Sequence, residues 1–272
     1  MEEERRASGT IFTVFSTASA VGKTLVAVNM AAEMAREGFQ VCVVDLDLQF
    51  GDVSNSLQLQ PEKTIFQAQQ EIRQDPELFD VRSCLTLYTH EEASFFVLAA
   101  PKLLEEAYNI STETVQQILK KLQQEFDYIV VDTAAAFSEL NLMAMDLSTL
   151  VTFIGIVDFI PTIKNMKIGY DTLTSIGYDQ SRIRFVLNRS NAQTRLDHSD
   201  VEELLGASFY HVLSNDFTAA QHSLQTGQPL VWAAGKSGLS EELRELVARY
   251  TNRSGAAVQE RGGSGWFKRI FK

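Results

Sequence analysis

The chain has 272 residues, of which 45% are hydrophobic and 22% are charged, so it can bury a full core and we expect one large domain. Its formal net charge of −11 argues against a large non-specific contact with nucleic acid, which requires clustered Lys and Arg. No apolar run is long enough for a signal peptide or a membrane-spanning helix, and we therefore expect a cytoplasmic protein. The two cysteines, Cys42 and Cys84, form no CxxC pair and are expected in the core.

Continuous apolar runs recur along the chain and indicate strands that are buried on both faces. They cover residues 10–16, 40–47, 95–100, 128–133, 150–157, 183–189 and 209–214. Segments with helical spacing lie between most of these runs, and a last helix is predicted over residues 237–251. This alternation predicts an α/β fold with a doubly wound, mostly parallel sheet of about seven or eight strands and helices on both faces.

The segment FSTASAVGKTLVAVNM, residues 15–30, connects the first predicted strand to the first long helix. Its Gly22-Lys23-Thr24 triplet is typical of a phosphate-binding loop, because the start of a helix favours an anion, a Lys can reach the β and γ phosphates and a Thr hydroxyl can bind Mg²⁺. The glycines that usually precede this triplet are missing. We nevertheless predict that the loop binds a nucleoside triphosphate with Mg²⁺, through Ser19, Ala20, Val21, Gly22, Lys23, Thr24 and Leu25.

Three aspartates end two of the predicted strands. Asp45 and Asp47 close the second strand, and Asp132 closes the run at residues 128–133. Open α/β sheets bind ligands at this edge, and a single Asp on an apolar strand suits a Mg²⁺ site. A strand-end Asp also commonly caps the next helix, but the combination of the loop with both strand ends favours a metal-nucleotide site.

The composition changes after residue 252, and we predict three parts. Residues 1–252 form the domain, residues 253–265 a flexible linker and residues 266–272 a short amphipathic helix. Because aromatic and basic residues would occupy opposite faces of that helix, it is expected to contact an anionic membrane from the cytoplasmic side. The alternative is that its aromatic residues pack back onto the domain.

Several of these segments together resemble the MinD/ParA family of deviant Walker A ATPases. The resemblance rests on the order of the loop, VVDLDLQFGDVSNSL and FDYIVVDT, and it covers about residues 10–250. The segments DLDLQFGDV, FFVLAAP, RIRFVLNRSN and VLSNDFTAAQHSLQTGQPLV are most similar to the CpaE/TadZ branch, which is involved in pilus assembly and polar localisation. The resemblance implies a P-loop NTPase fold, and the tail resembles the membrane-targeting helix of MinD.

The resemblance also implies roles for individual residues. Lys23 would hold the phosphates, and Asp47 would position the attacking water, so these two are the predicted catalytic residues. Thr24 and Asp132 would bind the magnesium ion, and Asp45 would support its ligand shell. Asn188 would read the adenine edge, although Asn at a strand end is also a common turn residue.

The loop departs from the family pattern KGGVGKT. Ala18 stands where the family has a lysine that reaches the partner's phosphates across a nucleotide-sandwich dimer, so a cation is lost where transition-state charge develops. Ser19 and Ala20 replace glycines, and a left-handed backbone at either would cost roughly 1–2 kcal/mol. Alternatively, the loop adopts a neighbouring conformation that needs no positive φ. The segment Thr133–Phe137 also lacks the family's prolines, which predicts a more flexible switch.

The resemblance implies an ATP-dependent positioning switch that serves pilus assembly or organises the cell pole or septum. Mg-ATP would favour a homodimer, the dimer would bind a membrane or an unidentified protein partner, and slow hydrolysis to ADP and phosphate would reset it. The alternative is a nucleotide-binding scaffold with little or no turnover. A DNA-partitioning role would need a basic face, and we expect none because the candidate residues are scattered: Lys164, Lys167, Arg182, Arg184 and Arg189.

Overall fold

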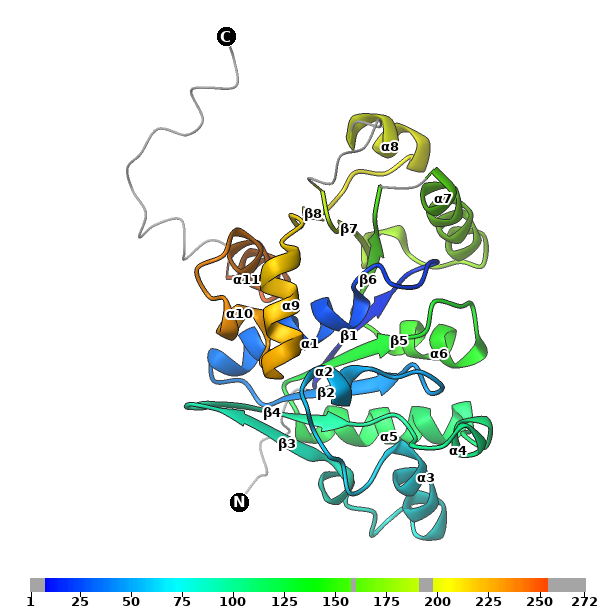
Figure 1. Ribbon diagram of the computed structural model, residues 1–272. Helices are drawn as coiled ribbons and strands as arrows, with labels where there is room; N and C mark the ends of the chain where they lie inside the picture. The colour runs from blue at the N-terminus through cyan, green and yellow to red at the C-terminus, as the bar shows by residue number, and fades with distance from the viewer. Residues whose placement is uncertain (1–7, 158–159, 191–197, 254–272) are drawn as a thin grey trace.

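A computed structural model of the chain describes residues 8–157, 160–190 and 198–253 (Figure 1). Within them, eight strands form one sheet in the order β3-β4-β2-β5-β1-β6-β7-β8. All neighbouring strands are parallel except β3 and β4, which are antiparallel. The strands are β1 (Thr10–Phe15), β2 (Val41–Leu46), β3 (Thr86–His90), β4 (Ala93–Leu98), β5 (Tyr128–Thr133), β6 (Leu150–Gly155), β7 (Ile183–Leu187) and β8 (His211–Val212).

Helices cover both faces of the sheet (Figure 1). Successive strand residues face opposite ways, so Val43 packs in a cluster with α1, α10 and α11, whereas Val44 packs in one with α3 and α5. A third cluster joins α7 and α8 to β6 and β7. The helices are α1 (Lys23–Arg36), α2 (Val53–Ser56), α3 (Ile65–Gln74), α4 (Leu104–Tyr108), α5 (Thr112–Glu125), α6 (Glu139–Leu147), α7 (Ile160–Ser175), α8 (His198–Leu205), α9 (Phe217–Thr226), α10 (Leu230–Ala233) and α11 (Gly238–Tyr250). The described helices include none that is long and apolar enough to cross a bilayer.

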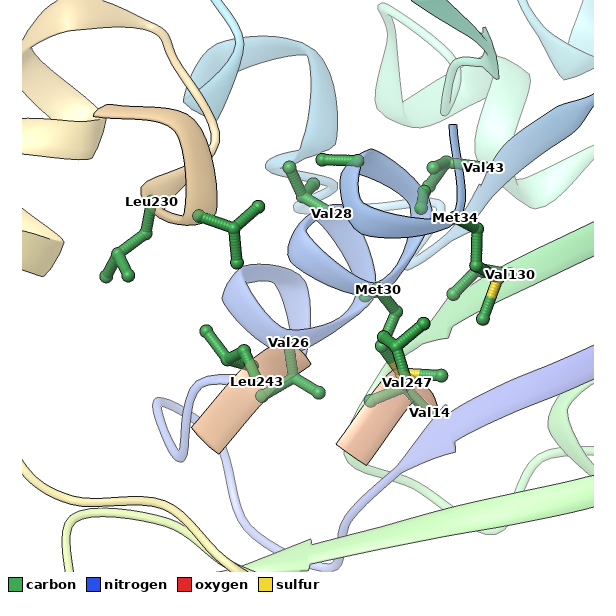
Figure 2. Packing of buried hydrophobic residues seen from close by; sticks show 14 of the residues in the cluster. Val14, Val26, Val28, Met30, Met34, Val43, Val130, Leu230, Leu243 and Val247 are labelled. Carbon is green, nitrogen blue, oxygen red and sulfur yellow. The ribbon is translucent and has the colours of Figure 1, made fainter. Parts of the chain in front are cut away.

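Helix α1 is buried along almost its whole length. Figure 2 shows its side chains between the sheet and α10–α11, with labels on Val26, Val28, Met30 and Met34 of α1 and on Val14, Val43, Val130, Leu230, Leu243 and Val247 around it. Each such side chain contributes roughly 1.5–3 kcal/mol when it is buried. Because α1 begins directly after the predicted phosphate-binding loop, this packing gives the loop a rigid support.

The predicted α/β architecture is confirmed, including every predicted strand. The strand ends differ from those expected by a few residues, and the last strand is reduced to His211–Val212. Strand β3 was not predicted. Its sequence, TLYTH, lies at the sheet edge with Leu87 exposed and Tyr88 buried, and it is joined to β4 through Glu91 and Glu92 instead of a recognisable Asn-Gly or Asp-Gly turn. Both cysteines are buried and free, as expected.

Candidate functional site

The predicted loop lies where the sheet reverses its strand order. Strand β1, which precedes the loop, is flanked by β5 on one side and β6 on the other, and such a switch point opens a crevice at the carboxyl ends of the strands. In the register of the sheet, Asp45 on β2 pairs with Asp132 on β5, and Asp132 pairs with Val14 on β1. The fold therefore places both carboxylates beside the loop.

The start of α1 is open to an anion. Its N-cap is Gly22, which has a φ of 97°, and no side chain caps the helix or puts a negative charge in its first turn. The first backbone N–H groups of a helix have no partner within the helix, and the helix dipole adds positive potential there. Lys23 stands at the first helical position and is mostly buried. These features fit a bound phosphate group.

The loop conformation decides between the two alternatives that the missing glycines left open. Ala20 has a φ of 58°, in the left-handed region, whereas Ser19 is not among the residues with positive φ. The loop thus keeps a conformation that suits glycine and accepts a cost of roughly 1–2 kcal/mol at Ala20.

Thr24 and Asp132 form the polar centre of the site. The Thr24 hydroxyl donates a hydrogen bond of 2.6 Å to Oδ2 of Asp132, while Oδ1 of Asp132 is buried and has no partner in the described part of the chain. Burial raises the pKa of Asp132 to about 7, against the opposing effects of the Thr24 hydrogen bond and the Lys23 charge. A cation next to Oδ1 would supply the missing interaction, so the residues present fit Mg²⁺.

The cation would depend on further ligands from outside the protein. Among the described residues, no three His, Cys, Asp or Glu side chains gather in a way that could hold a metal ion by themselves. Mg²⁺ commonly takes one or two protein ligands and completes its shell with waters and substrate phosphates. The site therefore suits a metal that arrives with a nucleotide.

Asp45 accepts hydrogen bonds from the loop that follows β2 with both of its carboxylate oxygens. Its Oδ1 accepts a hydrogen bond from the Asp47 amide (3.2 Å), and its Oδ2 accepts one from the Val53 amide (3.1 Å) at the start of α2. Burial, and next the neighbouring Asp132 charge, raise the pKa of Asp45 well above its usual value. Its contacts hold residues 47–53 in place, and Asp47 is left half-buried at the edge of the site.

A hollow of about 670 Å³ opens on the other side of Asp45. Its walls come from the loop before α2, from α2 itself, from the residues after α2 and from the loop after β4, and they include Phe50, Asn55, Gln60 and Lys102. Sequence analysis quoted DLDLQFGDV and FFVLAAP, which supply part of these walls, but nothing local in either segment indicates that the two lie side by side. It lies next to the predicted metal site and extends the crevice toward the sheet edge.

Two residues at the end of β7 hold the loop from the other side. Asn188 is buried, and its Nδ2 donates to the carbonyl oxygen of Val21 at 2.8 Å, while its Oδ1 accepts from the Arg189 amide at 2.9 Å. Arg189 Nη2 donates to the carbonyl oxygen of Ala20 at 3.1 Å. Sequence analysis counted Arg189 only among scattered basic residues, because nothing local indicates that β7 ends against the loop.

The comparisons with known proteins agree with this geometry. The CobQ/CobB/MinD/ParA nucleotide binding domain matches residues 12–229. The chain belongs to this family. Among proteins related to this family member, the septum site-determining protein MinD of Thermotoga maritima is 23% identical over 248 residues, which are 89% of this chain and 88% of that protein.

Two solved structures show that this CobQ/CobB/MinD/ParA family member shares the fold of MinD and ParA proteins. A ParA family ATPase of Chlorobium tepidum superposes with a TM-score of 0.80 at 21% identity, covering 89% of this chain and 98% of the other. The septum site-determining protein MinD of Pyrococcus horikoshii, solved in complex with Mg-ADP, gives a TM-score of 0.75 at 19% identity and covers 91% and 98% of the two chains.

In this family member, most of the predicted site residues come together at one edge of the sheet. The loop residues from Ser19 to Leu25 and the carboxylates of Asp45 and Asp132 gather at the carboxyl ends of β1, β2 and β5. Asn188 reaches the same place through the loop backbone, and its expected contact with adenine stays a prediction. The catalytic roles of Lys23 and Asp47 stay predictions as well.

Proposed function

We propose that the protein is an ATP-dependent positioning switch of the MinD/ParA type and that it binds Mg-ATP at the loop of residues 19–25. The observation that carries this proposal is the uncapped start of α1 with Lys23, next to the unpartnered Oδ1 of Asp132 and the Thr24 hydroxyl. One end of this arrangement attracts phosphate, and the other attracts a cation. Together they match the two parts of a metal-nucleotide complex.

Lys23 and the amides at the start of α1 would hold the β and γ phosphates, and Thr24 and Asp132 would hold Mg²⁺. The bound metal would neutralise negative charge on the phosphates. Asp47, whose backbone N–H donates a hydrogen bond to Oδ1 of Asp45 and so holds it near the site, would orient the attacking water. Turnover would be slow, because Ala18 replaces a cation that the resembling family brings to the phosphates of its dimer partner.

Mg-ATP would favour a dimer of two copies that meet over this edge of the sheet. Support comes from large apolar side chains that are exposed in or next to the lining of the hollow: Phe50 is part of the lining, and Leu103 and Leu104 directly follow Lys102, which is also part of it. Exposed aromatic and aliphatic side chains that gather near a ligand site are typical of a protein interface. A partner copy would cover them and shield the phosphates from water.

The dimer would position another structure in the cell through a membrane contact and an unidentified protein partner. The MinD protein of Thermotoga maritima is named for the septum site, and the resemblance to the CpaE/TadZ branch favours pilus assembly at a pole. The predicted membrane-binding helix at residues 266–272 lies outside the described residues, as does the linker apart from Arg253, which contacts Thr251.

A nucleotide-binding scaffold with little turnover is the second candidate function. The observations that favour it are the alanine at position 18 and the strained backbone of Ala20, since both weaken a loop that must stabilise a transition state. Phosphate release by the purified protein separates the two candidates, because the scaffold binds Mg-ATP without releasing phosphate above background.

Sedimentation tests the switch directly. The full chain should be a dimer with Mg-ATP and a monomer with Mg-ADP in analytical ultracentrifugation, and it should pellet with anionic phosphatidylglycerol vesicles only with Mg-ATP. Two short tails on one dimer act at a high effective concentration, which explains why a monomer should stay in solution. Deletion of residues 262–272 should abolish pelleting and leave the dimer intact. A chain that stays monomeric with Mg-ATP, or a deletion that pellets like the full chain, would contradict the proposal.

A further inference from the structure

Two consecutive residues after β7 hold two consecutive carbonyl groups of the phosphate-binding loop. Asn188 holds the carbonyl of Val21 through a 2.8 Å hydrogen bond, and Arg189 holds the carbonyl of Ala20 through a 3.1 Å hydrogen bond. The two contacts join positions that lie 167 and 169 residues apart in the sequence. We call this pair of hydrogen bonds the β7 clamp.

The clamp sets the direction of the loop's amide groups. A peptide group is planar and trans, so its C=O and N–H point in opposite directions. Because the carbonyls of Ala20 and Val21 point toward the end of β7, the N–H groups of the next residues, Val21 and Gly22, point away from it. Loop N–H groups that point to one side next to residues with positive φ form a concave anion-binding surface.

Both ends of the Arg189 hydrogen bond have an unusual backbone. Ala20 has a φ of 58° and Arg189 a φ of 57°, and neither residue is a glycine. Residues without the freedom of glycine keep such a conformation only where surrounding contacts impose it, and they cluster at functional sites. The hydrogen bond between them joins these two residues directly, and the Asn188 bonds to the Val21 carbonyl and the Arg189 amide hold the backbone beside each of them.

Asn188 also fixes how close β7 lies to the loop. A Cβ atom added to Gly22 would lie 2.4 Å from Asn188 Nδ2, so the glycine is needed at this position for space as well as for its φ of 97°. The loop therefore has a glycine only where Asn188 approaches it, and an alanine where Arg189 holds the backbone.

We propose that Arg189 is a positioning residue that, together with Asn188, keeps the altered loop in its anion-binding conformation in place of the missing glycine at position 20. This inference rests on the proposed binding of Mg-ATP at the same loop. Arg189 acts through the backbone of Ala20, so its effect depends on which residue occupies position 20. An arginine that only attracted phosphate by its charge would act independently of that residue.

A double-mutant cycle tests the clamp. Calorimetry with Mg-ATP should show binding about tenfold weaker for Arg189→Ala than for wild type, because without this hydrogen bond the free loop leaves its binding conformation and must regain it on binding. In an Ala20→Gly background, where the left-handed backbone carries no strain, Arg189→Ala should cost less than twofold. The matched control is Arg184→Ala, which removes a positive charge of the same kind from β7, where the side chain lies over Tyr210. This variant should bind Mg-ATP as tightly as wild type.

A second measurement needs no nucleotide. In the free protein, hydrogen exchange of the amides at residues 20–24 should be faster in Arg189→Ala than in wild type, and Ala20→Gly should reduce the difference. If wild type binds no Mg-ATP, the proposed function is wrong, but the hydrogen exchange of Arg189→Ala still tests whether the clamp holds the loop. Unchanged exchange in Arg189→Ala, or an affinity deficit that is equal in the two backgrounds, would overturn the inference.

Discussion

Two buried polar side chains, Asn29 at the middle of helix α1 and Asp132 beside its start, differ in whether both of their polar atoms have hydrogen-bond partners among the residues that the structure describes. Where its middle packs against α10 and α11, Asn29 accepts a hydrogen bond from the Val231 amide at 2.8 Å and donates one to the Leu25 carbonyl at 2.7 Å. At the start of the same helix, Oδ1 of Asp132 is buried with no partner in the described part of the chain. The pKa values of Asp45 and Asp132 are both raised there.

Of these two side chains, Asn29 stabilises the packing of α1, whereas Asp132 is arranged to bind a ligand at the start of the helix. A buried polar group with its partners rigidifies the packing around it, whereas one without a partner costs free energy until a ligand supplies the interaction. The left-handed backbone of Ala20 adds to the cost at the start of α1. The packed middle of α1 therefore supports the start of the helix, where polar groups are arranged for a ligand.

The largest expected effect comes from adding a charge to the ligand-binding end. Ala18→Lys restores a donor to the transition state, and since one such donor is worth roughly 10²–10³-fold in rate, phosphate release should rise by about that factor. Replacing Ala20 with Gly in the same protein should raise it further, because Ala20 has a left-handed backbone, and Asp47→Ala should remove what remains. A wild-type rate equal to that of Ala18→Lys would mean that another cation already replaces the lysine.

A smaller effect should follow from removing the buried charge. Asp132→Asn leaves an acceptor for the Thr24 hydroxyl but no carboxylate, so the free energy of unfolding of the nucleotide-free protein at pH 8 should rise by about 1–3 kcal/mol. Chemical denaturation measures this change. Magnesium should no longer strengthen nucleotide binding in the variant. The control is Asp171→Asn, which removes an exposed carboxylate paired with Lys167; it should change the free energy of unfolding by less than about 1 kcal/mol and leave the effect of magnesium unchanged.

The same variant should change how stability depends on pH. Because the pKa of Asp132 is raised from 3.8 to about 7 on folding, the folded protein binds more protons than the unfolded one between these values. This group therefore lowers the free energy of unfolding as the pH rises from about 4 to 7, and Asp132→Asn should remove that decrease. An unchanged pH profile would show that the carboxylate is not desolvated in the folded protein.

The sequence predicted the features that depend on neighbouring residues. The strands, the Gly22-Lys23-Thr24 triplet and the strand-end carboxylates of Asp45 and Asp132 are local patterns, and the parallel sheet brings such strand ends to one edge. The β7 clamp joins residues that are far apart in the chain, and the left-handed backbone of Ala20 depends on it. The commitment of both Asp45 oxygens to backbone amides depends on the path of the loop before α2. Neither feature leaves a signal in any short stretch of sequence.

Calorimetry with Mg-ATP on wild type and on Lys23→Ala tests most directly whether the start of α1 is a nucleotide site. The account predicts measurable heat and a higher melting temperature with Mg-ATP for wild type, and neither for Lys23→Ala, because Lys23 supplies the charge next to the uncapped helix. Lys167→Ala, a change of the same kind on α7, should bind like wild type. Wild type that gives no heat and no thermal shift at millimolar Mg-ATP, or a Lys23→Ala variant that binds as tightly as wild type, would contradict the account.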